Sequence, residues 1–389
     1  MMPSRLVVAT ASRVVPLLAA LLVAGPAVAR AAPPGDHWEI TPASTRALER
    51  GLAWLAANQG EKGSWGSPNL GLVATGALAF LAAGHTPGIG TYGAVVDRAL
   101  KHVIASAKPS GLLNVSTAQN DMYNHGLATF VLGQAYGMTD DPNIGRSLGA
   151  ALKLIAQAQG PAGGWNYQAK PQDGDLSLCV MQAKALRSAV DSGLEIPPEV
   201  IEKAIARVRK HYTPKGVAAN APEADQRKAP GQFTYGIGGG NPTPAMAAAG
   251  VVCLQEFGQY DDWRIPKSME VVHKAIRDAK QPTAKKGAMP LDAYTLYYAG
   301  QSLYQVGGEG WREHYPKLRD CLVAGQADDP RDAKSGFWEA GAHVHGTDGQ
   351  LYGTAVACFI LAIPNRYLPI LQEGKIDDIQ RRFSSSQQE

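Results

Sequence analysis

Apolar residues recur along this chain with the spacing of an amphipathic helix, and they do so in six separate segments. Within each segment they follow one another at i, i+3 or i+4, and i+7, which places them in one stripe along a helix. We therefore predict six helices that each pack on one face. The six stripes are Leu48, Leu52, Leu55; Val96, Leu100, Val103; Ile144, Leu148, Leu152, Ile155; Ile201, Ile205, Val208; Met269, Val272, Ile276; and Trp311, Tyr315, Leu318, Leu322.

A second set of segments alternates with the first and is apolar on nearly every side. A helix of this kind is buried on every side. Strand patterns are nearly absent, so six outer helices around six buried inner helices predict an all-α fold. We expect a single α/α toroid (barrel) of about six helical hairpins over residues 42–370. The inner segments are 72–83, 123–136, 176–190, 244–257, 291–306 and 351–363.

The two ends of the chain differ from the repeated region. Two arginines precede an apolar run over 14–25, and alanines at alternating positions follow, as in a signal peptide. The run is shorter than the roughly 20 residues of a membrane-spanning helix. We predict a signal peptide over 1–31, cleaved after Ala29 or Ala31, with an uncleaved anchor as the alternative. The expected product is an exported protein, periplasmic or extracellular, with a linker over 32–41 and a polar tail over 371–389.

Net charge, cysteine content and the length of apolar stretches exclude several classes of partner and of structure. The 389 residues carry a net charge of +3 with acidic and basic residues interspersed, so nucleic acid is not an expected partner. Four cysteines in so long a chain do not form a disulfide framework. After the first 31 residues no stretch of membrane-spanning length is free of Gly, Pro and charge, so we expect no transmembrane segment after cleavage.

Two loops after outer helices carry the same motif, in which Trp65 follows Gln59, and Trp165 follows Gln159, at the same spacing with Gly between. This motif resembles the QW repeat of the squalene–hopene cyclase and protein prenyltransferase superfamily. An interrupted third copy lies at 326–338, and the segment 353–369 resembles the closing segment of exported bacterial, planctomycete-like proteins with prenyltransferase or squalene oxidase repeats. The resemblance covers 42–370 and implies one terpenoid-cyclase-like toroid.

Acidic residues gather where the predicted inner helices begin. Asp121, Asp173, Asp175, Asp292 and Asp348 precede or open four of these helices. In an α/α toroid the inner helices run parallel, so their first turns meet at one end, which we call the acidic rim. Each Asp also fits the simpler role of a helix N-cap.

The segment 163–177 resembles the one that carries the D-x-D-D motif of class II terpene cyclases, in which a carboxylic acid protonates an alkene. The resemblance implies that Asp175 is the catalytic acid and Asp173 its electrostatic partner. Leu176 stands where the motif has its last Asp. The sequence therefore leaves open whether the protein is an enzyme; an enzyme of this kind would be an isomerase or lyase.

Aromatic and rim residues complete the candidate site. In the leading hypothesis they line a central apolar cavity that binds or acts on an isoprenoid-like hydrophobic small molecule. For each tyrosine, core packing is the alternative. The candidate ligand-binding residues are Trp165, Tyr167, Tyr123, Tyr297, Tyr352, Asp121, Asp292 and His345.

No cofactor is expected from the residues. The prenyltransferase resemblance implies a zinc site built from Asp, Cys and His, and Cys179 with His343 are the weak candidates for it. A buried, inert thiol is the alternative for Cys179.

Two long connections, 215–241 and 328–347, join an outer to an inner helix, so we expect both to lie over the acidic rim. They support the alternative function, a non-catalytic secreted scaffold or binding module whose loops take a protein or polysaccharide partner. A wide apolar interior favours the isoprenoid hypothesis, and a filled barrel with an aromatic loop face favours the binding module.

Overall fold

The structure is a computed structural model, and it describes residues 38–115, 121–218, 220–283, 286–329, 335–342 and 344–371. The predicted signal peptide, the segment 372–389 of the predicted tail and the zinc candidate His343 lie outside the described residues.

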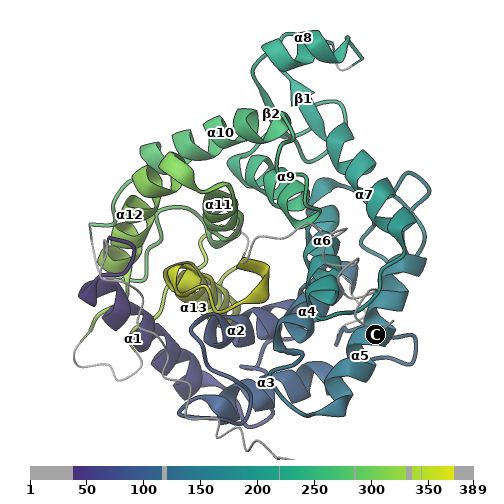
Figure 1. Ribbon diagram of the computed structural model, residues 1–389. Coiled ribbons are helices and arrows are strands. Elements are labelled where there is room, and N and C mark those ends of the chain that lie inside the picture. Colours follow the sequence, from purple (N-terminus) through teal and green to yellow (C-terminus); the bar gives the residue numbers. More distant parts are fainter. Residues whose placement is uncertain are drawn as a thin grey trace, which may run out of the picture. The chain divides into compact units, whose positions relative to one another are not determined.

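Helices alternate between two concentric rings, as Figure 1 shows. The fold is a single α/α toroid, as the repeated pattern predicts. The outer helices are α1 (Pro42–Asn58), α3 (Gly93–Ala105), α5 (Pro142–Gln157), α7 (Pro198–Lys210), α10 (Arg264–Asp278) and α12 (Gly308–Gly325). The inner helices are α2 (Leu70–Ala82), α4 (Asp121–Ala135), α6 (Leu176–Asp191), α9 (Pro244–Glu256), α11 (Ala293–Val306) and α13 (Gly346–Ala362).

Burial divides the two rings as the apolar pattern predicts. On the outer helix α7, Val200, Ile201, Ala204 and Val208 are buried in one stripe, while the opposite side is exposed. On the inner helix α2 every residue except Leu72 is buried. Removing apolar surface from water on both faces of the inner ring supplies the main stabilising term of the fold.

The glutamine of each QW motif joins the end of one outer helix to the start of the next. Gln59 Nε2 donates to the Val95 carbonyl at 2.9 Å, and Gln159 Nε2 donates to the Val200 carbonyl at 2.8 Å. Gln326 Nε2 donates to the Ala47 carbonyl at 2.8 Å and thereby closes the ring from α12 to α1.

The tryptophan of each motif fixes the loop to its own outer helix. Its Nε1 donates to a helix carbonyl: Trp65 to Leu55 at 2.7 Å, Trp165 to Ile155 at 2.8 Å and Trp338 to Leu322 at 2.9 Å. The third copy, interrupted in sequence, therefore makes the same contacts as the other two. The longer spacing between Gln326 and Trp338 displaces neither side chain from these contacts.

Two further segments of the chain lie outside the rings. Strands β1 (Tyr212–Pro214) and β2 (Gly231–Phe233) pair antiparallel, with Tyr212 opposite Phe233, and carry the short helix α8 (Glu223–Lys228) away from the toroid (Figure 1). The turns η1 (Ile363–Asn365) and η2 (Pro369–Leu371) follow α13. The Ile370 amide donates to Gln134 Oε1 at 3.2 Å, so this closing segment crosses the carboxyl ends of the inner helices.

The last residues of the predicted linker belong to the toroid. Trp38 packs edge-on against Trp311 and Tyr315, both with ring centroids 6.4 Å away. Glu39 accepts a hydrogen bond from Trp311 Nε1 at 2.6 Å and pairs with Arg366 at 3.0 Å. The boundary at residue 41 is thus too late, because the side chains before the first helix dock onto α12.

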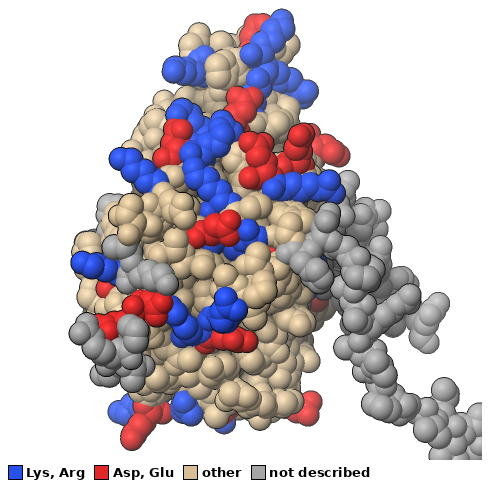
Figure 2. All heavy atoms as spheres, turned by 90° about the vertical axis from the view of Figure 1, so that its left-hand side faces the viewer, with Lys and Arg blue, Asp and Glu red and all other residues tan. Residues whose placement is uncertain are grey.

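Acidic and basic side chains are interspersed over the face drawn in Figure 2. On that face neither sign of charge forms a continuous field, in keeping with the small net charge of +3. Among the described residues, no helix has both the length and the apolar character needed to cross a membrane.

Candidate functional site at the acidic rim

Asp175 lies at the N-terminus of α6 and is part of a polar cluster. Its Oδ1 accepts hydrogen bonds from the Ser177 amide at 2.9 Å and the Ser177 hydroxyl at 2.5 Å. The Tyr235 hydroxyl lies 2.6 Å from that of Tyr167. Burial, the Asp175 carboxylate and the Tyr167 hydroxyl together raise the pKa of Tyr235. Asp175 therefore caps its helix and also interacts with Tyr235, whose hydroxyl meets that of Tyr167.

Tyrosines from opposite sides of the ring meet beside this cluster. Tyr123 on α4 interacts with Tyr294 on α11, and burial together with the neighbouring tyrosines raises the pKa of Tyr123. The rings of Tyr294 and Tyr298 lie edge to face, 5.1 Å apart. Tyr352 on α13 has a raised pKa through burial, the nearby tyrosines and Asp292. The structure thus brings four of the predicted residues, Tyr123, Tyr352, Asp175 and Asp292, to one mouth.

Deeper in the ring, side chains of α11 continue to reach α6 on the far side of α9. The Tyr298 hydroxyl donates to Met181 Sδ at 3.3 Å. Lys184 Nζ bonds Gln301, and it lies 3.7 Å from Glu256 and 4.2 Å from the ring centre of Phe130.

The predicted Tyr297 is only 2% exposed and packs against Tyr298 and Phe359, at ring separations of 5.1 and 5.4 Å. Side chains that reach from one inner helix to another thus occupy this part of the toroid interior. The isoprenoid hypothesis places an apolar cavity there.

Two predicted residues hold the repeat together instead of facing a ligand. Asp173 accepts hydrogen bonds from the backbone amides of Ala162 at 2.9 Å and Gly164 at 2.8 Å, one on each carboxylate oxygen. Trp165 is fully buried, so it presents no surface to a ligand. Leu176, in the place of the last Asp of the cyclase motif, is also fully buried.

The remaining rim candidates open helices. Asp292 caps α11 by accepting hydrogen bonds from the Thr295 amide at 3.0 Å and the Thr295 hydroxyl at 2.7 Å. Asp121 begins α4 and bonds Asn114. His345 stands exposed at the N-cap of α13. These contacts agree with the capping alternative for Asp292, whereas the bond of Asp121 is to the Asn114 side chain and not to a backbone amide of α4.

The zinc candidate Cys179 is 1% exposed, and burial raises the pKa of its thiol to about 12. A thiol of this kind stays protonated at neutral pH and is a poor ligand. Within the described ranges, no three or more His, Cys, Asp or Glu side chains form a group that could hold a metal ion.

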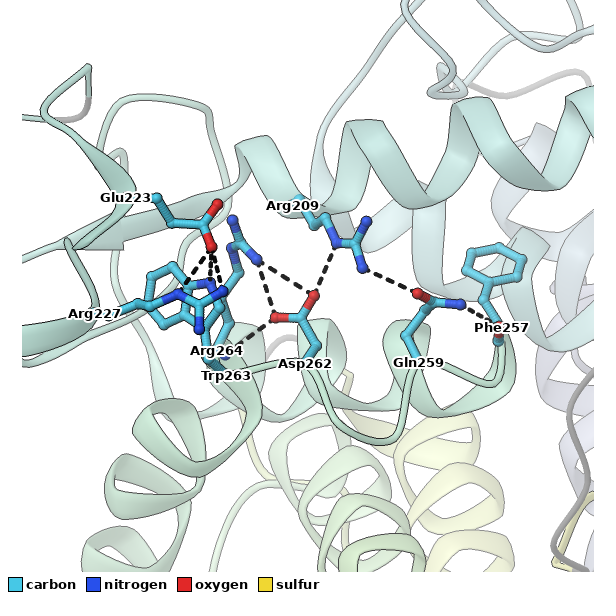
Figure 3. A network of polar contacts seen from close by, with 8 residues as sticks. All are labelled: Arg209, Glu223, Arg227, Phe257, Gln259, Asp262, Trp263 and Arg264. Atoms are coloured by element: carbon cyan, nitrogen blue, oxygen red, sulfur yellow. Dashed lines mark hydrogen bonds and ion pairs between the residues drawn. The ribbon is translucent and has the colours of Figure 1, made fainter.

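The first long connection reaches the rim only through its return segment, which carries Tyr235. Its helix α8 lies elsewhere, where α7 meets α10, and Figure 3 shows the contacts there. Glu223 accepts a hydrogen bond from Trp263 Nε1 at 3.1 Å, and Arg209 pairs with Asp262 at 2.8 Å. The expectation that all of 215–241 lies over the rim is therefore wrong, because the β1–β2 hairpin carries its middle outward.

The second long connection builds a pocket at the rim that the sequence does not predict. Phe337 packs against Trp54, with ring centres 5.8 Å apart. The pocket beside them, which we call the aromatic rim pocket, has a volume of about 410 Å³. It is lined by Trp54, Asn58, Trp65, Phe337, Thr347, Gln350 and Leu351. The aromatic residues of the loop were the sequence signal for this surface. That Trp54 and Asn58 of α1 also line the pocket follows only from the closure of the ring, which brings α1 beside this loop.

The chain matches no family model and no curated protein. Several solved structures are similar to this chain. A family 76 glycoside hydrolase (mannosidase) from Bacteroides thetaiotaomicron is 9% identical with a TM-score of 0.56, over 83% of this chain and 99% of that chain. A D-mannose isomerase is 12% identical with a TM-score of 0.54, over 84% of this chain and 99% of that chain. The type II terpene cyclase MstE from Scytonema is 13% identical with a TM-score of 0.49, over 84% of this chain and 99% of that chain.

Likeness at such low identity concerns the fold alone. It confirms the α/α toroid, and it does not single out the squalene–hopene cyclase and prenyltransferase superfamily that the QW motifs resemble.

Proposed function

We propose that this protein is an exported, non-catalytic toroid that binds a saccharide at the acidic rim. The observation that carries the proposal is the aromatic rim pocket. Its aromatic rings can face the C–H groups of a sugar ring. Asn58 Nδ2 and Gln350 Nε2 donate to the Trp54 carbonyl and to Glu339 Oε1, both at 2.9 Å, and the two amide oxygens can accept hydrogen bonds from hydroxyls. The Tyr235 and Tyr167 hydroxyls beside Asp175 form a second polar, aromatic group at the same rim.

The geometry around Asp175 supports binding over alkene protonation. A proton donor to an alkene must carry its proton and needs a neighbour that holds it in place. Both oxygens of Asp173 are occupied by backbone amides, and Leu176 supplies no carboxylate. Asp175 itself accepts hydrogen bonds from Ser177. The Asp175 side chain is thus engaged as the N-cap of α6.

The test measures binding to the mature chain, purified from the exported fraction, by isothermal titration calorimetry. Because the similar toroids include a mannosidase and a mannose isomerase, manno-oligosaccharides lead the panel, followed by other neutral glycans. We expect Phe337→Ala and Gln350→Ala each to weaken binding by about tenfold or more, since either change removes about 1.4 kcal/mol or more of contact energy. Tyr136→Ala, at the opposite end of α4 and 40% exposed, is the matched control.

Native mass spectrometry on the same sample separates this proposal from the isoprenoid hypothesis. A bare chain that begins at residue 30 or 32 agrees with an exported binding module. A co-purifying prenyl lipid would restore the isoprenoid hypothesis, and binding that survives both rim substitutions would remove the saccharide proposal.

A further inference from the structure

A larger pocket lies at the other end of the toroid, where the inner helices finish. We call it the lower pocket, and its volume is about 530 Å³. The ends of α6, α9 and α11 line it together with the start of α12 and the closing segment after α13. This volume lies within the range of small-molecule sites, roughly 300–1,000 Å³.

The walls of the lower pocket combine aromatic rings with buried amides. Tyr260, Tyr304 and Trp311 supply the rings. The Gln255 side chain is only 5% exposed and makes no hydrogen bond within the described part of the chain. The polar atoms of Gln255 are not fully enclosed by protein, so its amide is open to the pocket. Gln305 Oε1, on the same wall, is buried without a partner among the described residues, which costs about 1–3 kcal/mol unless a ligand or water pairs with it. An amide has both donor N–H groups and an acceptor oxygen. A hydroxyl group can accept from the first and donate to the second.

The buried charges around the pocket balance one another. Arg187 and Glu256 line it at 3% and 1% exposure. Arg187 pairs with Asp191 at 2.7 Å, and Glu256 lies 3.7 Å from Lys184 and accepts from Gln305 Nε2 at 3.1 Å. Two buried cations therefore face two buried anions, and Arg366, which also lines the pocket, is paired with Glu39 at 3.0 Å. An additional charge on a ligand would be buried without a partner, which is costly.

We infer that the lower pocket is a second binding site, separate from the acidic rim, and that it takes a neutral polyhydroxyl molecule such as a single sugar ring or a polyol. Hydroxyls pair with Gln255, the apolar face of the ring packs on the aromatic wall, and the absence of charge leaves the four buried ions undisturbed.

The experiment uses the mature full chain and isothermal titration calorimetry. The neutral probes are glucose, mannose and myo-inositol, and the charged relatives are gluconate and glucosamine. We expect saturable binding of at least one neutral probe and at least tenfold weaker binding of both charged relatives.

Two substitutions place the binding site. Val306 lines the mouth and is 39% exposed, so Val306→Trp fills the pocket from the surface. Gln255→Leu keeps the size of the side chain and removes its amide. We expect the first variant to abolish binding and the second to weaken it at least tenfold. Ile89→Trp is the matched control, because Ile89 is 68% exposed and does not line this pocket.

Failure of this inference is distinguishable from failure at the rim. If neutral probes do not bind at millimolar concentrations, or bind Gln255→Leu and Val306→Trp as they bind the unchanged chain, the lower pocket is not a site. Phe337→Ala alters the rim alone, so binding that this variant removes belongs to the rim and would overturn the assignment. If Val306→Trp does not fold, Gln255→Leu decides alone.

Discussion

Single glycines in the QW loops determine how closely one repeat approaches the next. Gly63 has a φ of +81°, and a Cβ built there would lie 2.3 Å from the Arg98 carbonyl oxygen on α3. Gly163 makes the same approach to the Lys203 carbonyl oxygen on α7, at 2.2 Å. Gly111, in a repeat without Gln or Trp, also lies against an outer helix, and a Cβ built there would lie 2.6 Å from the Ala150 carbonyl oxygen. Close packing of a loop glycine against the next outer helix therefore also occurs in a repeat that lacks the QW motif.

Three alanine substitutions in the first loop separate backbone strain from steric overlap. Gly60 has neither a positive φ nor a close neighbour, and Gly66 has a φ of +75° with open space around it. Gly63 has both a positive φ and a close neighbour, the backbone of Arg98. We expect Gly60→Ala to leave the free energy of unfolding unchanged, Gly66→Ala to lower it by about 1 kcal/mol, and Gly63→Ala to lower it by about 2–4 kcal/mol. Urea denaturation measures all three. Equal losses for Gly63→Ala and Gly66→Ala would show that the contact with α3 does not matter.

His125 makes stability depend on pH. It is fully buried, accepts a hydrogen bond from the Leu113 amide at 3.0 Å, and its Nε2 lies 3.2 Å from the Ala151 carbonyl oxygen. Burial lowers the pKa of His125 from 6.5 to about 4. Between these values the unfolded chain binds a proton that the folded chain does not. Stability is therefore full above pH 6.5 and falls toward pH 4, by about 3 kcal/mol from this residue.

Denaturation at a series of pH values tests this expectation. His125→Gln keeps an acceptor and a donor but does not titrate. The variant should lose less stability on acidification than the unchanged chain. His211, whose pKa burial also lowers to about 4, accounts for part of the remaining slope. An identical slope in the variant would mean that His125 does not contribute.

At the scale of the helices, stability depends on how consecutive outer helices join. Each QW glutamine brings the carboxyl end of one outer helix to the amino end of the next, so opposite ends of the helix dipoles meet. Where α7 meets α10 the chain lacks the motif, and the pair Arg209–Asp262 takes its place at 2.8 Å (Figure 3).

Gln326 is the junction that closes the ring. It donates to the Ala47 and Gly336 carbonyls, both at 2.8 Å, and accepts from Arg50 at the same distance. We expect Gln326→Leu to lower the free energy of unfolding by about 2–3 kcal/mol, because buried polar groups lose their partners. Hydrogen exchange should become faster in α1 before other helices. Gln168→Leu, at an exposed loop position, is the control. Uniformly faster exchange would argue against a local role in closure.

At the scale of the whole molecule, the buried pair Lys184–Glu256 links inner helices of different hairpins. Both side chains are almost wholly buried, and burial lowers the pKa of Lys184 and raises that of Glu256. Removing one charge leaves the other buried alone. We expect Lys184→Met and Glu256→Gln each to cost about 3–5 kcal/mol, and the double variant to cost much less than their sum. Additive losses would show that the two charges do not interact.

The exposed pair Lys101–Asp97 on α3, at 2.8 Å, is the control for this double-mutant cycle. We expect no measurable coupling there, because water screens a surface ion pair.

Much of the fold could be predicted, and less of the site. Apolar residues at helical spacing, such as Leu48, Leu52 and Leu55, mark the buried face of a single helix. The helices and their order along the chain can therefore be predicted from the sequence. The convergence of Asp175 and Asp292 at one rim follows from the parallel inner helices. Tyr235 was missed as a partner of Asp175, because a loop 60 residues away has no periodicity that locates its side chains.

The sequence by itself determined the twelve alternating helices, the repeat and the closure of a toroid, because apolar periodicity and motif spacing act between near neighbours. Only the tertiary structure decided that the interior is crossed by side chains, as in the contact between Met181 and Tyr298. The aromatic rim pocket and the lower pocket likewise became evident only in the tertiary structure. These features depend on which side chains from distant helices meet and on the volume they leave, and no local pattern encodes either.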